Sequence, residues 1–181
     1  RVLEVLRGKC DGSVVTVDSG SYTMPVQTFA SGYYLPASMT ADPASLINYK
    51  APKGTDRIVF KYRPSMSFGD ARPIIYYQLS INDTLIDSTY TKYNAGDQGI
   101  MSYEFEALIT KSMVTDITST NKYQFHARSH NTTNRARYFS QTFTNNTADI
   151  LIAQDYIHLT AIGEENLVYN LTNQYSITEG Q

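Results

Sequence analysis

The sequence predicts an all-β protein, a single jelly-roll sandwich of eight to ten antiparallel strands. Two observations lead to this expectation. Short segments that alternate apolar and polar residues recur along the chain, and clusters of turn-forming residues separate them. The length of 181 residues suits one domain. A chain of this size buries roughly 70% of its unfolded surface, so its core needs no disulfide or metal.

In the first half of the chain, the strongest strand signal covers residues 55–63. Here Ile58, Phe60 and Tyr62 alternate with polar or basic residues, and this period of two predicts a half-buried strand. Pro64 ends the segment because proline cannot donate a hydrogen bond to a sheet. Two shorter strands between turn clusters are expected earlier, at Val14–Val17 and at 21–25.

In the second half, residues 74–81 predict another strand, followed by a turn at Asn82 and a short strand at 84–87. Residues 100–110 contain good helix formers, but their alternation favours a strand over a helix. Further strands are expected at 122–129, 135–143, 148–154 and 156–162. We therefore place the jelly-roll domain at residues 1–162. Residues 163–181 lose the alternation and predict a C-terminal arm or a frayed end.

Composition excludes several classes of protein. The formal net charge of −2 argues against nucleic-acid binding, for which a basic domain is expected. No apolar run approaches the roughly 20 residues that span a bilayer. Cys10 is the only cysteine, so there is no internal disulfide and no cysteine-based zinc site. The chain begins at Arg1 rather than Met, which suggests a mature or trimmed product.

The sequence offers little catalytic chemistry. It contains no nucleophile elbow, phosphate-binding loop or dinucleotide fingerprint. His126 and His130 are four residues apart, which on a strand means about 13 Å, too far for one metal ion. His158 alternates with apolar residues and is expected to be a structural strand residue. We therefore predict a protein that is not an enzyme, with no catalytic residue, metal site or cofactor.

One cluster of cations is unusual for a protein of low charge. We expect residues 122–143 to form a hairpin whose loop is centred on 131–134. Its alternation places Phe125, Ala127, Ala136 and Tyr138 toward the core. The opposite face then carries His126, Arg128, His130, Arg135 and Arg137. Like charges on directly opposed residues of neighbouring strands are destabilising. The presence of so many cations on one face therefore requires an explanation.

Two interpretations of this basic face remain open. It is either a solvated face with salt bridges to acids of an adjacent strand, or a surface that binds anions or a second subunit. The 15 Tyr of the chain also have two interpretations, because they suit either a subunit interface or the core. Four sequons are candidates for N-glycosylation, at Asn82, Asn131, Asn145 and Asn170.

Several stretches together resemble a known family. They are the segment 10–23, the segment 47–62, the segment 75–86 and the closing Tyr156–Ile162. The last of these is similar to the C-terminal strand of tumour necrosis factor/C1q-like jelly rolls. As a whole, the chain resembles capsid-decoration or fibre-head proteins of large DNA viruses or phages of aquatic microbes. The resemblance implies a homotrimer whose outer loops carry receptor or glycan binding.

Three functional hypotheses follow. The first is a non-enzymatic structural or attachment protein of a virion, which self-associates and contacts a receptor or neighbouring capsid or fibre proteins. The alternative is an extracellular C1q-like or lectin-like domain that binds glycan or protein. The third is a β-sandwich enzyme or an accessory domain of one. The expected location is accordingly the virion, or else the extracellular space, and jelly-roll folds alone do not decide between them.

Overall fold

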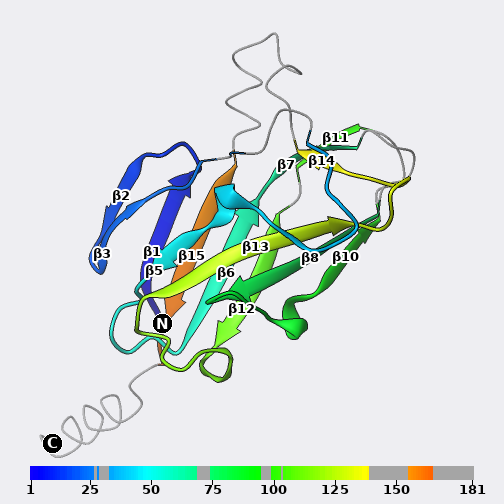
Figure 1. The fold of residues 1–181 in the computed structure, drawn as a ribbon. Helices are drawn as coiled ribbons and strands as arrows, with labels where there is room; N and C mark the ends of the chain where they lie inside the picture. Colours follow the sequence, from blue (N-terminus) through cyan, green and yellow to red (C-terminus); the bar gives the residue numbers. More distant parts are fainter. Residues whose placement is uncertain are drawn as a thin grey trace, which may run out of the picture.

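A computed structural model describes residues 1–26, 28, 33–68, 74–94, 99–102, 104–138 and 155–164. In this part of the chain, two antiparallel sheets pack face to face as a β-sandwich of jelly-roll type (Figure 1). The all-β fold class predicted from the sequence is therefore confirmed. Short strands bring the count to fifteen among the described residues, above the eight to ten expected.

The first sheet has four strands, in the order β1-β15-β6-β12. They are β1 (Val2–Lys9), β15 (Tyr156–Ile162), β6 (Arg57–Arg63) and β12 (Phe105–Thr110). Burial alternates strictly along β6, β12 and β15, so each strand shows one face to the core and one to solvent. The start of β1 meets the end of β15, where the Arg1 amino group donates to the Gly163 carbonyl oxygen at 2.8 Å.

The second sheet follows the order β10-β8-β13-β4, with β5 also paired to β13 and β9 to β8. Its central strands are long, β8 (Ile74–Ile81) and β13 (Asn121–Ser129). The edge strands are short, namely β4 (Thr40–Ala41), β5 (Ile47–Tyr49), β9 (Thr84–Leu85) and β10 (Thr91–Asn94). In Figure 1 this sheet lies in front of the first one.

Smaller elements close the ends of the sandwich. The strands β2 (Val14–Val17) and β3 (Gly20–Thr23) form a hairpin, and β7 (Ser65–Phe68) pairs with both β11 (Gly99–Ser102) and β14 (Arg137–Tyr138). Three short 3-10 helices complete the described part, η1 (Pro43–Ser45), η2 (Asp87–Thr89) and η3 (Lys111–Met113). No helix in it is long and apolar enough to cross a membrane.

Aromatic residues hold the two sheets together. Phe125 on the second sheet is fully buried, and its ring centroid lies 5.1 Å from those of Tyr62 and Phe105 on the first. Tyr77 lies 5.2 Å from Phe125 and 6.4 Å from Phe105. These edge-on and tilted contacts are the favoured geometry of aromatic pairs. Several of the tyrosines that the sequence assigned to either core or interface are therefore core residues.

Several strands predicted from alternation agree with the structure. The segments 74–81 and 156–162 are β8 and β15 with the same bounds, and 55–63 contains β6. The segment 100–110 is not one strand, because Gly99–Ser102 and Phe105–Thr110 belong to different sheets. The strand expected at 148–154 and the arm from 165 onward lie outside the described residues.

Candidate functional site

The outer face of the second sheet carries a group of aromatic and basic side chains. On β8 and β13, the residues Tyr77, Phe125 and Ala127 are fully buried, so their neighbours in sequence point away from the core. The strand register places Tyr76 directly opposite Arg128. Directly opposed residues on one face of a sheet have Cβ atoms about 5 Å apart, so these two side chains meet.

Four residues form what we call the aromatic–cation cluster: Tyr76, Tyr90, Arg128 and His130. The guanidinium carbon of Arg128 lies 3.9 Å from the ring centroid of Tyr76. The rings of Tyr76 and Tyr90 are stacked, with centroids 5.5 Å apart and an interplanar angle of 29°. The ring centroids of His130 and Tyr76 are 5.9 Å apart, and the His130 Nδ1 is 3.1 Å from the Tyr76 hydroxyl oxygen.

Hydrogen bonds fix the Arg128 side chain in place. Its Nη2 donates to the Tyr90 hydroxyl at 3.0 Å, and its Nη1 donates to the Ser129 carbonyl oxygen at 3.3 Å. These bonds use only part of the five N–H donors of a guanidinium. Arg128 forms no ion pair with any carboxylate in the described part of the chain. It is thus a positioned cation with donors to spare.

The cluster is open to solvent. Tyr90 keeps 45% of its surface exposed, and His130 is exposed as well. Tyr90 follows η2, a 3-10 turn that ends at Thr89, whose hydroxyl accepts a hydrogen bond from the backbone N–H of Leu79 at 2.9 Å. This bond ties the turn to the neighbouring strand and holds the Tyr90 ring over the sheet. The aromatic–cation cluster is therefore held by strands and a short turn rather than by a long loop.

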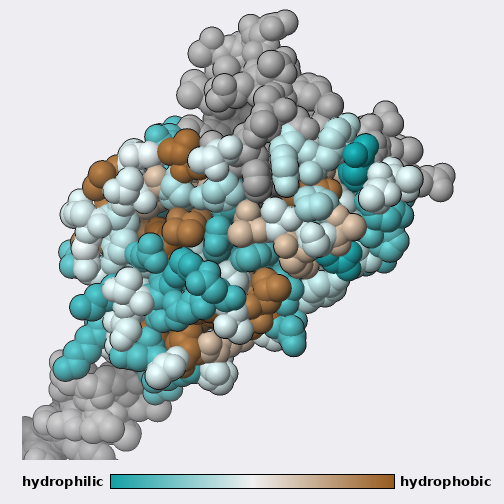
Figure 2. All heavy atoms as spheres, in the orientation of Figure 1, coloured by the Kyte–Doolittle hydropathy of each residue, from teal (hydrophilic) through white to brown (hydrophobic). Residues whose placement is uncertain are grey.

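Polar groups lie on the same face beside the cluster. His126 is directly opposite Gln78, and its Nε2 lies 2.9 Å from the Ser80 hydroxyl. Gln78 is 5% exposed and donates to Asp87 at 3.4 Å. Burial lowers the pKa of His126 below its ordinary value, and this keeps the imidazole neutral near pH 7. Figure 2 shows a mainly polar face with separate apolar residues.

The predicted hairpin at 122–143 is wrong. The strand β13 pairs with β8, β4 and β5, whereas Arg137 pairs with Ser67 in a different sheet. His126 and Arg128 do share the outer face of β13, and His130 follows at its end. Arg135 lies elsewhere, with its guanidinium carbon 4.1 Å from the ring centroid of Tyr34. The strand with His126 and Arg128 and the segment with Arg135 and Arg137 are therefore not paired with each other as predicted.

The partners of Arg128 come from strands distant in the sequence. From the sequence alone, Tyr76 and Tyr90 were predicted only to belong to an interface or to the core. Nothing local in the sequence pairs Tyr76 with a residue more than fifty positions away. The period-two pattern gave the face of each strand, but the identity of the neighbouring strand depends on the sheet topology.

Two of the four sequons lie in the described residues. Asn131 accepts three hydrogen bonds at its side-chain oxygen, from the backbone N–H groups of Thr133 and Asn134 and from the Thr133 hydroxyl. Asn82 occupies the β8–β9 turn with a φ of 50°, and its side-chain nitrogen donates to Asn121 at 2.9 Å. Asn145 and Asn170 lie outside the described residues.

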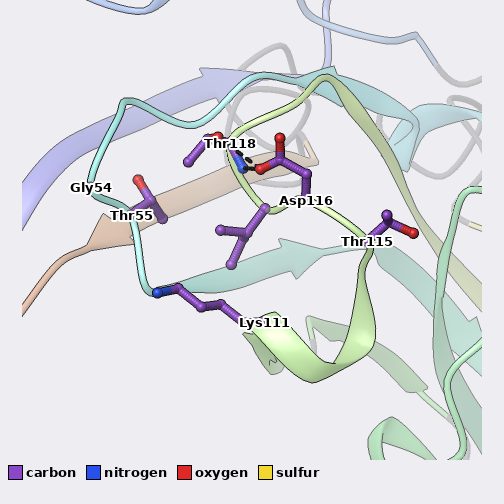
Figure 3. Close-up of a pocket in the computed structure, with 7 residues that line it drawn as sticks. Gly54, Thr55, Lys111, Thr115, Asp116 and Thr118 are labelled. Carbon is purple, nitrogen blue, oxygen red and sulfur yellow. Dashed lines mark hydrogen bonds between the residues drawn. The ribbon is translucent and has the colours of Figure 1, made fainter.

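A pocket of about 330 Å³ lies at the end of the sandwich, between the loop at Gly54 and the turn after β12. Its polar groups are committed to local structure (Figure 3). The Asp116 carboxylate accepts from the backbone and hydroxyl of Thr118 at 2.9 and 2.8 Å. Lys111 forms an ion pair with Asp56 at 2.9 Å. Because these groups already satisfy one another, the pocket is a weaker candidate than the aromatic–cation cluster.

The remaining reactive groups have structural surroundings. Cys10 is 7% exposed, and burial followed by the nearby Asp155 raises the pKa of its thiol. A thiol in such surroundings is a poor nucleophile. No group of three or more His, Cys, Asp or Glu residues within the described ranges could hold a metal ion.

A scan against protein-family models and a search of curated proteins return no match for this chain. Among solved structures, the fold is similar to the CBM36-1 domain of a multidomain xylanase from the hindgut metagenome of Trinervitermes trinervoides. That likeness has 8% identity and a TM-score of 0.37, and it covers 89% of this chain and 100% of that one.

A second similar structure is the carbohydrate binding module CBM6cm-2 from Cellvibrio mixtus lichenase 5A, in complex with cellotriose. It has 7% identity and a TM-score of 0.33, over 90% of this chain and 99% of that one. Both are carbohydrate-binding modules, whereas the sequence resemblance was to tumour necrosis factor/C1q-like jelly rolls and viral structural proteins. At these levels of similarity, no argument about function rests on either structure.

Proposed function

We propose that this protein is a non-enzymatic glycan-binding domain, and that the aromatic–cation cluster is its binding site. One observation carries the proposal: the cation Arg128 is held against the Tyr76 ring and has no carboxylate partner in the described residues. Exposed aromatic rings offer an apolar surface for the C–H face of a sugar. The free N–H donors of the guanidinium suit a carboxylate or sulfate.

These properties favour an acidic glycan over a neutral one. A guanidinium that is stacked on a ring has lost part of its hydration, so an incoming anion displaces little water from it. Tyr90 is exposed on one side and holds Arg128 through its hydroxyl on the other. One side chain therefore links the sugar-stacking surface to the anion-binding group.

The test is a glycan array with purified protein, followed by calorimetry on the strongest ligand. We expect sugars with uronic acid or sulfate groups to bind and neutral sugars to bind weakly. Arg128→Ala should weaken binding of the acidic glycan by about ten- to a hundredfold, the range for hydrogen bonds to charged groups. Tyr90→Ala should weaken neutral sugars by about threefold to tenfold, and acidic sugars by more, because it also removes the hydroxyl that holds Arg128.

The matched control is Lys111→Ala, which removes one cation that follows β12 of the first sheet, whereas the cluster lies on the second sheet. It should leave glycan affinity unchanged. Arg128→Lys keeps the charge but loses the planar group, so it should recover only part of the affinity. Equal binding by wild type and Arg128→Ala, with both proteins folded, would exclude this site.

A structural or attachment protein of a virion is the second candidate. The observation that favours it is the presence of exposed apolar residues on the outer face of the first sheet, Val5 at 36% and Leu108 at 49% exposure. Self-association as a homotrimer, contact with capsid or fibre proteins, and location in a virion or outside the cell remain predictions. An antibody against this chain that labels purified particles would support the virion. Labelling of the extracellular fluid alone would support the alternative.

A further inference from the structure

The outer face of the first sheet carries a row of three apolar residues and one threonine that crosses all four strands. The strand registers align Val5, Thr160, Val59 and Leu108 side by side. The residues at the two edges are exposed, Val5 at 36% and Leu108 at 49%, and the two between them are half-buried. Exposed apolar side chains that lie on one face are candidates for contact with another surface.

Charges of opposite sign lie at the two edges of the same face. The next row is Arg7, His158, Lys61 and Glu106 in strand order. Arg7 and, one row further, Lys9 are exposed cations on β1 that form no ion pair within the described ranges.

The acids of this face are at the β12 edge. Glu106 has 58% of its side chain exposed and Glu104 has 40%. The Nζ of Lys61 lies 3.6 Å from the Glu106 carboxylate and 3.7 Å from the Glu104 carboxylate. The β1 edge of the face therefore carries cations and the β12 edge carries acids. Between the two edges lie Val59 and Thr160, together with the outward-facing Arg57, Lys61 and Arg63 of β6.

We propose that this face binds a second copy of the chain around a two-fold axis that lies in the interface and runs parallel to the strands. Such a rotation places β1 of one copy over β12 of the other. Val5 then faces Leu108, and Arg7 faces Glu106, and each contact occurs twice by symmetry. Sheets pack about 10 Å apart at about 30°, so these pairs meet with some offset.

Charge selects this axis over the other in-plane axis. A two-fold axis perpendicular to the strands stacks β1 on β1 and β12 on β12. The cations at Arg7 and Lys9 then meet no acid of the second copy, and the acids of β12 face one another. Only the axis parallel to the strands joins the positive edge to the negative edge in both halves of the interface.

The size of the face sets the strength of the association. Four strands span about 19 Å and seven residues about 23 Å, so each copy contributes a footprint of about 450 Å². The total is near the lower limit of roughly 1,000 Å² for a specific interface. We therefore expect a weak, concentration-dependent dimer.

Sedimentation equilibrium from low micromolar to near-millimolar concentration tests the proposal. Wild type should approach twice 20.3 kDa at high concentration. Arg7→Glu and Glu106→Arg should each weaken the dimer by about tenfold, because each reversal sets like charges together twice. The double variant Arg7→Glu/Glu106→Arg should restore dimerisation, since it pairs the opposite charges again. A mixture of the two single variants should form the heterodimer.

Two further variants separate this face from general effects. Lys92→Glu makes the same charge change as Arg7→Glu on the other sheet, and it should leave dimerisation unchanged. Leu108→Asp changes an exposed position and should remove dimerisation. Its thermal unfolding transition should show that the protein is still folded. A monomer at every concentration, three times 20.3 kDa, or no rescue by the double variant would overturn the proposal.

Discussion

A buried carboxylate in the first strand gives the sharpest test of the fold. A bulge between Val2 and Glu4 shifts the register of β1, and Glu4 points inward at 8% exposure. Its carboxylate accepts three hydrogen bonds: from the Ser19 hydroxyl and the Tyr49 hydroxyl at 2.6 Å each, and from the Ser19 backbone N–H at 2.9 Å. These bonds join the β2–β3 hairpin and β5 to the first sheet.

We expect Tyr49→Phe to lower the free energy of unfolding by about 2 kcal/mol, the value of one hydrogen bond to a charged group. Glu4→Gln weakens all three bonds and should cost more, about 3–4 kcal/mol. For a chain of this length, a loss of 2 kcal/mol lowers the melting temperature by roughly 4–8 °C. The double variant should cost less than the sum of the single variants, since both remove the same bond.

Urea unfolding of the four proteins measures this cycle. A coupling energy of at least about 1 kcal/mol between Glu4 and Tyr49 is expected. Additive effects would refute the reasoning, because they would mean that the carboxylate and the phenol do not interact. Tyr22→Phe extends the test to the outer part of the same network, because its hydroxyl lies 2.9 Å from the Ser19 hydroxyl and donates to the Lys50 carbonyl oxygen at 3.1 Å.

Two further predictions concern packing and pH. Gly8→Ala should destabilise the protein by about 1–3 kcal/mol, because a Cβ at this position lies 2.6 Å from Cγ of the buried Met24. Thermal unfolding measures the change. An unchanged melting temperature would show that the Met24 side chain moves freely. Burial lowers the pKa of His126 below 6.5, so the unfolded chain binds a proton that the folded one does not. The free energy of unfolding measured in urea should therefore fall as the pH drops below about 6.5. His126→Gln should make this fall with pH less steep. An equally steep fall in the variant would exclude His126 as the cause.

Period-two alternation was enough to predict the central strands and the all-β class. Segments such as Tyr156–Ile162 have one apolar face and one polar face, and this pattern arises from the local geometry of a strand. The strand Val2–Lys9 did not stand out, because Glu4 occupies an inward position and Val5 an outward one. A buried carboxylate reverses the expected pattern, and its hydrogen-bond partners at Ser19 and Tyr49 are invisible in the local sequence.

The candidate site was only partly predictable for a different reason. The outward direction of His126 and Arg128 follows from the pattern of one strand. The contact with Tyr76 depends on which strand lies beside β13, and the sequence favoured the nearest one in the chain. The actual neighbour is β8, because the segment from 130 to 136 leaves the second sheet and leads into β14, which pairs with β7 in another sheet. Sequential strands usually pair, and here that rule gave the wrong partner.

The two proposed surfaces lie on opposite faces of the sandwich, and this position decides how they combine. In a dimer formed through the first sheets, the second sheets become the outermost layers of a four-layer stack. At about 10 Å between layers, the two aromatic–cation clusters are then some 30 Å apart and face in opposite directions. Such a dimer gains no avidity for a single flat surface, since both clusters cannot reach it. It is instead arranged to connect two glycan-bearing surfaces.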